Sequence, residues 1–316
     1  EMGVETIEMP SLPEDILFSL EVAPQTSALL IVDMVPLGRG PLSVALELYP
    51  EVIIFDHEYL DLPYELGTVL RMNPRFSSPP LPCSILSYMV ASRLDREFED
   101  LAWLALLGAI GEGTLNLPME LLRRSLRARR SALTLINRAI LSLLSVMGEK
   151  GVRIASGVIE SSLEGPAGIL DRRSLLSSIF WRESNRCLER LRRAMENPAV
   201  EVGDYFAVFK VEVPSLRLGV AQLGLESFEV SAGLFCDEVV TRLSIRSRSP
   251  LDLLGLAKSF LIGMEHSIMG REDYVEISMR TTDLDKFLAG FSEGLGRRLT
   301  EKRNAEGGSD ISALEV

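Results

Sequence analysis

In the stretch Val52-Ile53-Ile54-Phe55-Asp56-His57-Glu58, four apolar side chains are followed directly by three polar ones. Its apolar half predicts a buried β-strand, and its polar half places an acid and one of the two histidines of the chain directly after that strand. Residues 28–32 (Ala-Leu-Leu-Ile-Val) form another such run, which ends at Asp33. Loops containing glycine and proline, and short helical patterns, separate these runs. The order predicts an α/β fold in which helices cover the faces of a parallel sheet.

Acidic side chains are expected to gather at one edge of this sheet. Ligands bind at the carboxyl ends of the strands in open parallel sheets, and Asp33 and Asp56 are expected to lie there. Residues 100–110 are almost entirely apolar and predict a buried helix that leads to Glu112. Carboxylates together with His57 could bind a divalent metal. The alternative is structural: the two aspartates cap helices, the histidine is satisfied within the fold, and Glu112 is an exposed loop acid.

Composition narrows the class of protein. The chain has 316 residues, of which 47% are hydrophobic, and this predicts a globular protein with room for two cores. No signal peptide and no uninterrupted membrane-spanning stretch is visible, and the three cysteines have no metal-binding spacing, so we expect a cytoplasmic protein with reduced thiols. The net charge of −12 argues against broad, non-specific binding of nucleic acid. Scarce lysine and glutamine fit either a heat-adapted chain or a coding bias.

In the rest of the chain the sequence pattern changes first to one typical of helices and then to one typical of strands. Residues 118–197 are predicted to be mostly helical and hold two arginine-rich stretches, 121–130 and 171–194, whose arginines either form solvated helix faces or bind a partner. After residue 200 the pattern alternates as in strands, with a hairpin around Asp237-Glu238. Residues 301–316 are polar and are expected to be disordered.

In this order the segments resemble the DHH phosphoesterase superfamily, and within it the archaeal RecJ-like proteins. Residues 29–33 resemble the second motif of the family, residues 52–58 its Asp-His-His signature, and residues 101–112 its fourth motif. Ser244-Ile245-Arg246-Ser247 is similar to the nucleic-acid-facing strand of the DHH-associated domain, and residues 263–266 stand where that domain has Gly-Gly-His. The resemblance implies four parts: a parallel-sheet DHH domain (1–116), a helical connector (117–200), a smaller α/β DHH-associated domain (201–300) and a tail (301–316).

The residues that differ from the family pattern stand at motif positions on which its metal-dependent reaction depends. Glu58 replaces the second histidine of the signature, Glu112 replaces the usual aspartate, and Met264-Glu265-His266 replaces Gly-Gly-His. The first motif, a histidine and two aspartates, is absent from the sequence. Two-metal catalysis needs ligands for both ions, so we expect Asp33, Asp56 and His57 to bind one cation weakly at most. Asp33, Asp56, His57, Glu58 and Glu112 are then vestigial catalytic positions.

The resemblance therefore implies a non-catalytic member of the superfamily that works in the archaeal replicative helicase. It would bind the GINS complex and, through it, the MCM ring, need no cofactor, and contact no membrane. Arg246, Arg248 and His266 would contact nucleic acid or a partner, and His266 could equally be a plain surface histidine. One alternative is a manganese-dependent exonuclease or oligonucleotide phosphodiesterase. Another is a weak, salt-sensitive binder of single-stranded DNA.

Overall fold

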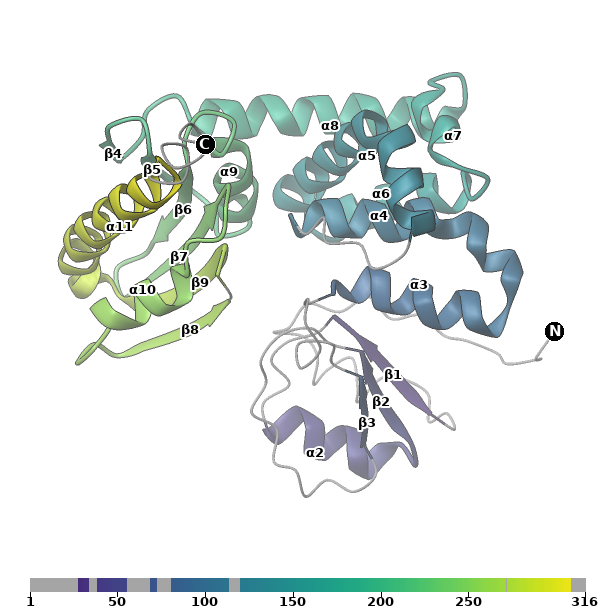
Figure 1. Cartoon of the computed structure of the whole chain (residues 1–316), viewed down its shortest axis with the longest axis horizontal. Helices are drawn as coiled ribbons and strands as arrows, with labels where there is room; N and C mark the ends of the chain where they lie inside the picture. Colours follow the sequence, from purple (N-terminus) through teal and green to yellow (C-terminus); the bar gives the residue numbers. More distant parts are fainter. Residues whose placement is uncertain are drawn as a thin grey trace, which may run out of the picture. The chain divides into compact units, whose positions relative to one another are not determined.

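The fold was analysed in a computed structural model, which describes residues 28–33, 39–55, 69–72, 81–113, 120–270 and 272–307 (Figure 1). The chain divides into two compact units. The first comprises residues 1–137 and 164–166, and the second comprises residues 138–163 and 167–316. The four-part division expected from the sequence stays a prediction.

The first unit contains a three-stranded parallel sheet, which confirms the predicted class of fold. Its strands lie in the order β1 (Leu29–Val32), β2 (Val52–Phe55) and β3 (Val69–Met72). Helix α2 (Arg39–Leu48) connects β1 to β2 and packs Ala45 against Ile31 and Ile54. Strand β1 was expected to be buried on both faces, but Leu30 and Val32 are exposed. The reason is that α2 covers only the face that carries Ile31.

Two further helices of this unit pack closely against each other. Helix α3 (Cys83–Leu94) is followed by the 3₁₀ helix η3 (Arg96–Leu101) and by α4 (Ala102–Gly111), whose Trp103 and Leu106 are fully buried, as the apolar pattern predicted. The Ser84 hydroxyl at the start of α3 donates to the Ala105 carbonyl of α4 (3.1 Å). Gly108 of α4 packs against Ser84, where a β-carbon would collide.

Helix α5 (Glu120–Met147) begins in the first unit and ends in the second. By length and composition its residues Arg129–Met147 are apolar enough to cross a membrane. However, Leu133, Ile136 and Leu143 are fully buried on one side of the helix. A core helix of a soluble protein passes the same test, so this helix is weak support for a membrane span.

The helical part of the second unit continues with α6 (Glu149–Glu160), α7 (Pro166–Leu170) and α8 (Leu175–Ala194). The Ser174 hydroxyl caps α8 by accepting from the Ser177 amide (3.1 Å). The Trp181 indole donates to the Ile169 carbonyl (2.7 Å), and Phe180 packs edge-on against the same indole. These contacts fix the buried side of α8, and its arginines lie on the other side.

A six-stranded mixed sheet forms the rest of the second unit (Figure 1). Its order is β4-β5-β6-β7-β9-β8, and only the β5–β6 pair is parallel. The strands are β4 (Val200–Val202), β5 (Phe206–Lys210), β6 (Val230–Cys236), β7 (Val240–Ser247), β8 (His266–Gly270) and β9 (Tyr274–Arg280). The predicted hairpin around Asp237-Glu238 is the β6–β7 pair.

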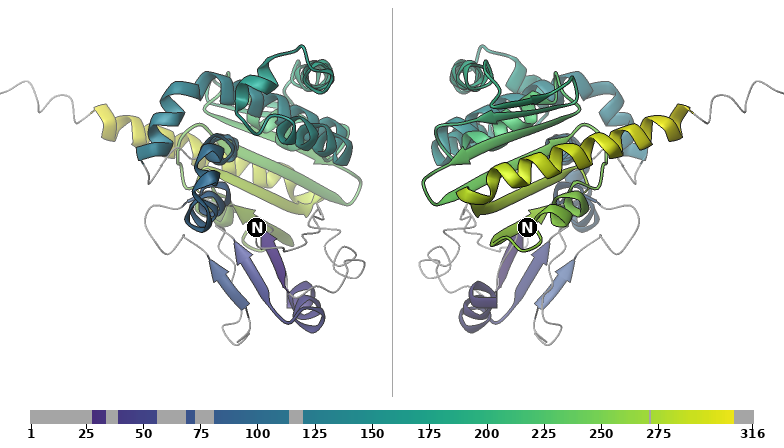
Figure 2. Two further views of the ribbon diagram at one scale, coloured as in Figure 1. Left: turned by 90° about the vertical axis from the view of Figure 1, so that its right-hand side faces the viewer. Right: turned by 90° about the vertical axis from the view of Figure 1, so that its left-hand side faces the viewer.

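Helices cover both faces of this sheet, since successive side chains of a strand point to opposite sides. Helices α10 (Leu253–Phe260) and α11 (Leu284–Gly307) lie side by side on one face, and Figure 2 shows α11 running along the sheet. Phe206, Leu243, Ile277 and Phe291 belong to the core on this side. Helix α11 continues to residue 307, into the segment expected to be disordered, and Lys302 in this stretch donates to the Ser249 hydroxyl (2.7 Å).

Helix α9 (Leu216–Gly224) packs on the opposite face of the sheet. Ala207 and Phe209 of β5 meet Val220 of α9 and Leu191 of α8 there. Gly233 of β6 lies directly under the backbone of Arg217, the second residue of α9, and leaves no room for a side chain. The remainder of this face is polar, and it carries Ser244, Arg246 and Glu276.

The β6–β7 turn makes the stability of the fold depend on pH through the carboxylate of Asp237. The Asp237 carboxylate accepts from the amides of Val240 (2.6 Å) and Val239 (2.8 Å), and these bonds lower the pKa of Asp237. Because its pKa is lowered in the folded state, Asp237 stabilises the fold above the ordinary aspartate value of about 3.9, and that contribution disappears as the pH falls through the lowered value. Asp237→Asn should therefore reduce the loss of thermal stability between pH 5 and pH 3.

Circular dichroism melts across this pH range measure the effect. Glu238→Gln removes one negative charge from the same exposed turn and serves as the matched control. If wild type and Asp237→Asn lose melting temperature in parallel, the carboxylate does not have the proposed role.

Candidate functional site

The carboxyl ends of β1 and β2 lie next to each other, as the sequence predicted. The parallel register pairs Val32 with Phe55, and the Asp33 amide extends the ladder by donating to the Phe55 carbonyl (2.9 Å). Asp33 is exposed and has a left-handed backbone (φ 56°), a conformation that aspartate tolerates better than most residues. The carboxylate of Asp33 is thus at the edge of the sheet where ligands bind in such folds.

The neighbouring candidates follow Phe55 in the sequence. Asp56, His57 and Glu58 lie outside the residues that the structure describes, so their role stays a prediction. Across the described ranges, no group of three or more histidine, cysteine, aspartate and glutamate side chains could hold a metal ion. Two carboxylates and one imidazole, from Asp33, Asp56 and His57, would suit one divalent ion but are too few to fix two.

Glu112 is positioned by α4. It ends this helix, donating its amide to the Gly108 carbonyl (3.0 Å), and its side chain is half-buried. The first turn of α3 links α4 to the end of β2: the Cys83 thiol donates to the Phe55 carbonyl (3.5 Å), while Ser84 bonds to α4. The elements that precede Asp56 and Glu112 are therefore both anchored to one helical turn.

A polar network occupies the α9 side of the C-terminal sheet. Its centre is the Glu276 carboxylate of β9, which accepts from the hydroxyls of Ser244 (2.5 Å) and Tyr274 (2.7 Å) and from the Arg217 guanidinium (3.3 Å). Arg217 also donates to Ser244 (3.3 Å), and the Arg246 guanidinium lies 4.5 Å from the centre of the Tyr274 ring. Ser244, singled out in the sequence, thus bonds to a carboxylate of the chain itself, and Arg246 stacks on the tyrosine whose hydroxyl bonds to the same carboxylate.

The roles of Arg217 and Glu276 were not predicted from the sequence. The signal for Glu276 was present, because the alternation of residues 274–280 and of 240–247 places every second side chain on one face. The β7–β9 register then pairs Ser244 with Glu276 and Arg246 with Tyr274. Arg217 comes from a helix between two strands, and only the tertiary fold places it beside this acid.

The other two C-terminal candidates have local structural roles. The Arg248 guanidinium donates to the carbonyls of Leu225 (2.6 Å) and Phe228 (3.2 Å), which follow α9. These two bonds account for an arginine at position 248 without any contact with a ligand. His266 is exposed at the start of edge strand β8, and its Nδ1 lies 2.9 Å from the Met264 carbonyl oxygen. Their predicted contact with nucleic acid or a partner stays a prediction.

The fold of the chain is similar to that of solved DHH-domain proteins, including RecJ. A solved DHH domain, from a protein described as a member of a family of ribosomal proteins, is similar with a TM-score of 0.55 and 17% identity, over 84% of this chain and 68% of that one. RecJ from Thermus thermophilus, solved in complex with Mn²⁺, is similar with a TM-score of 0.54 and 17% identity. This match covers 90% of this chain but only 47% of RecJ, so the chain spans about half the length of that protein.

At such low identity the two structures show the fold of the chain and nothing of its activity. No family model and no curated protein sequence matches the chain. The α/β architecture expected from residues 29–33, 52–58 and 101–112 is confirmed.

Proposed function

We propose that this chain is a RecJ-like scaffold without phosphodiesterase activity, which works in the cytoplasm as part of the archaeal replicative helicase. It would bind the GINS complex and, through it, the MCM ring. The observation that carries the proposal is the Glu276 network. On the strand that resembles the nucleic-acid-facing strand of the family, the Ser244 hydroxyl donates to the internal Glu276 carboxylate, and the Arg217 guanidinium donates to the same carboxylate from α9. A phosphate entering there would meet the negative charge of Glu276.

The substituted motif positions support the same proposal. Glu58, Glu112 and Glu265 stand where the resemblance implies a histidine, an aspartate and a glycine. Each change alone could be tolerated by a phosphodiesterase, but together they are more simply explained by loss of the reaction than by three compensations. The net charge of −12 also fits protein partners better than bare DNA. Contact with single-stranded DNA would be weak and sensitive to salt.

Binding to GINS is tested with purified components. Size-exclusion chromatography of the chain mixed with an archaeal GINS complex, both at micromolar concentration, should give a joint peak. Separate elution of the two proteins would count against the scaffold. The MCM ring should join the complex only when GINS is present.

The enzymatic alternative predicts a different result, and the position of Asp33 beside the end of β2 is the observation in its favour. We expect no cleavage of 5′-labelled single-stranded DNA in the presence of Mn²⁺, and the same background for wild type and Asp56→Ala. Denaturing gels followed over time make this measurement. Mn²⁺-dependent cleavage that is lost in Asp56→Ala would show that the site is active.

A further inference from the structure

Helix α8 carries a row of exposed side chains along its outer side. Figure 1 shows α8 at the upper margin of the second unit, above the helices α6 and α9 that it contacts. The side chains that α8 buries include Phe180, Ser184, Cys187 and Leu191. Because an α-helix turns by about 100° per residue, positions 175, 182, 186 and 193 share one line on the opposite side. This outer line is occupied by four exposed residues, Leu175, Arg182, Arg186 and Arg193.

Arginine predominates on α8 although the chain as a whole is acidic. The helix contains five arginines and two glutamates, in a chain whose net charge is −12. Cations in a last turn are stabilised by the helix dipole, which accounts for Arg192 and Arg193. Arg182 and Arg186 lie in the middle of the helix, beyond the reach of this effect. The outer line is therefore more basic than the positions of its residues in the helix explain.

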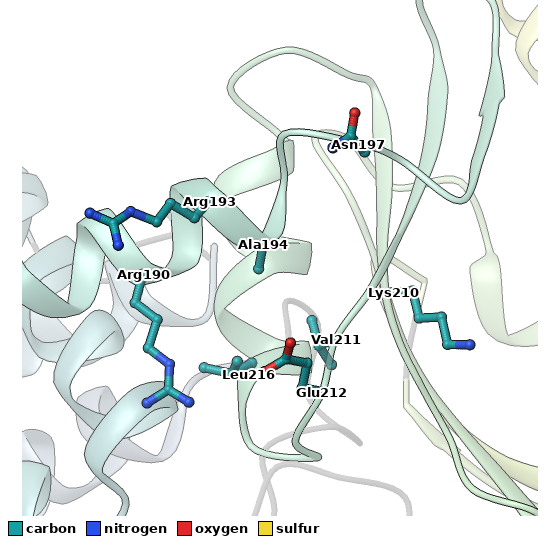
Figure 3. A pocket seen from close by; sticks show the side chains of 8 residues that line it. All are labelled: Arg190, Arg193, Ala194, Asn197, Lys210, Val211, Glu212 and Leu216. Carbon is teal, nitrogen blue, oxygen red and sulfur yellow. The ribbon is translucent and has the colours of Figure 1, made fainter.

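The guanidinium groups on the outer line keep N–H donors for an external acceptor. Arg182 and Arg186 both donate to Glu183 (2.9 and 3.2 Å), and the bond from Arg182 is the main cause of the lowered pKa of Glu183. One carboxylate is thus shared by two side chains that are 60% and 67% exposed. Arg193 forms no ion pair among the described residues, and Figure 3 shows its guanidinium pointing away from the pocket between α8 and the end of β5. Positive charge thus faces solvent along this side of the helix.

Two leucines extend this surface at the beginning of α8. Leu175 is 76% exposed, and the adjacent Leu176 is 47% exposed. Leu175 lies on the outer line itself, two turns before Arg182. Apolar side chains left in water contribute binding free energy when a partner covers them. The outer face of α8, which consists of the outer line and Leu176, thus joins an apolar end to a basic stretch.

We propose that the outer face of α8 binds an acidic helix of a partner protein. Carboxylates spaced along such a helix would pair with Arg182, Arg186 and Arg193, and an apolar side chain near its end would pack on Leu175. The contrast in charge supports an acidic partner, and the exposed leucines support a protein. The proposal goes beyond the scaffold function and does not require GINS to be the partner.

A nucleic-acid strand fits this face less well. Glu183 and Glu189 lie among the arginines, and their negative charge would repel phosphates. A mostly acidic helix can meet these two carboxylates with a lysine or an arginine, which a phosphate backbone does not carry. Both aromatic side chains of α8, Phe180 and Trp181, are buried, so the face lacks the stacking surface with which proteins hold the bases of single strands.

The probe is a fluorescein-labelled peptide of three repeats of Leu-Ala-Ala-Glu-Glu-Ala-Ala, which places leucine and glutamate on one face when it is helical. It is titrated against the full chain by fluorescence anisotropy at low salt, because salt screens exposed ion pairs. Arg186→Glu should raise the dissociation constant about threefold, and Arg186→Glu combined with Arg193→Glu about tenfold. Leu175→Ser should raise it about threefold. The same peptide with glutamine in place of glutamate should bind about tenfold more weakly.

Arg297→Glu on α11 is the matched control. Arg297 is 67% exposed, as Arg186 is, and it also pairs with a glutamate of its own helix, so its reversal should leave the affinity unchanged. Circular dichroism melts verify that each variant is folded. A peptide that does not bind, or that binds the double variant as tightly as Arg297→Glu, would overturn the proposal. Tighter binding of an oligothymidylate than of the peptide, lost in the double variant, would overturn it in favour of nucleic acid.

Discussion

Gly233→Ala is expected to destabilise the second unit by about 3 kcal/mol, because overpacking against backbone cannot be relieved by a change of rotamer. A β-carbon at this position would overlap with the carbonyl oxygen and Cα of Arg217. Relief would require α9 to move away from β6, and this would separate Val220 from Phe209 in the core. Arg217 would move with the helix, so its bond to Glu276 would be strained as well.

Chemical denaturation followed by circular dichroism measures this change in the free energy of unfolding. Gly157→Ala is the matched control: Gly157 lies within helix α6, and nothing in the described part of the chain is within 4 Å of the position its β-carbon would take. That substitution should stabilise the protein slightly, by about 0.5–1 kcal/mol, because alanine favours the helix. Equal stabilities of the two variants would show that the close approach of α9 to β6 is not a constraint.

Glu276→Ala should have the larger effect of the two, a loss of about 3–5 kcal/mol, because it leaves the Arg217 charge with little solvent and without its partner. Only 13% of the Arg217 side chain and 16% of the Glu276 side chain is exposed. The hydroxyls of Ser244 and Tyr274 would lose their acceptor at the same time. Unfolding in urea, with the slope checked for two-state behaviour, gives the value.

The double variant Arg217→Met with Glu276→Leu distinguishes a buried charge from simple loss of packing. It removes both charges, and it also removes Arg217 Nη1, a buried donor that has no acceptor among the described residues. Its stability should therefore recover most of the loss seen in Glu276→Ala. Glu265→Ala, which breaks the exposed ion pair with Arg280, is the surface control and should cost less than about 1 kcal/mol. A Glu276→Ala protein as stable as this control would contradict the argument.

The elements that follow from runs and alternation of apolar residues could be predicted from the sequence. The runs 28–32 and 52–55, each followed by an aspartate, predicted a parallel sheet, and the apolar segment 100–110 predicted a buried helix. The alternation around Asp237 predicted the β6–β7 hairpin. In each case the buried side chains belong to one short segment, so the local pattern of apolar residues predicts which side chains are buried.

Contacts between distant residues could not be obtained in this way. Ser84 has the side chain of a helix cap, but the close approach of Gly108 offers its hydroxyl a carbonyl on α4. Strand β8 and helix α9 were not recognised, because the first lies at an exposed edge and the second is only nine residues long. The Arg217–Glu276 pair joins residues 59 positions apart, and no local pattern marks it.

The start of helix α3 has a mechanical consequence for the acidic positions. Cys83 bonds to the last residue of β2, and Ser84 bonds to α4. Two adjacent side chains therefore connect the strand that precedes Asp56 with the helix that ends at Glu112. The positions of β2 and α4 are thus coupled through the first turn of α3, and a substitution at Cys83 or Ser84 is expected to disturb both.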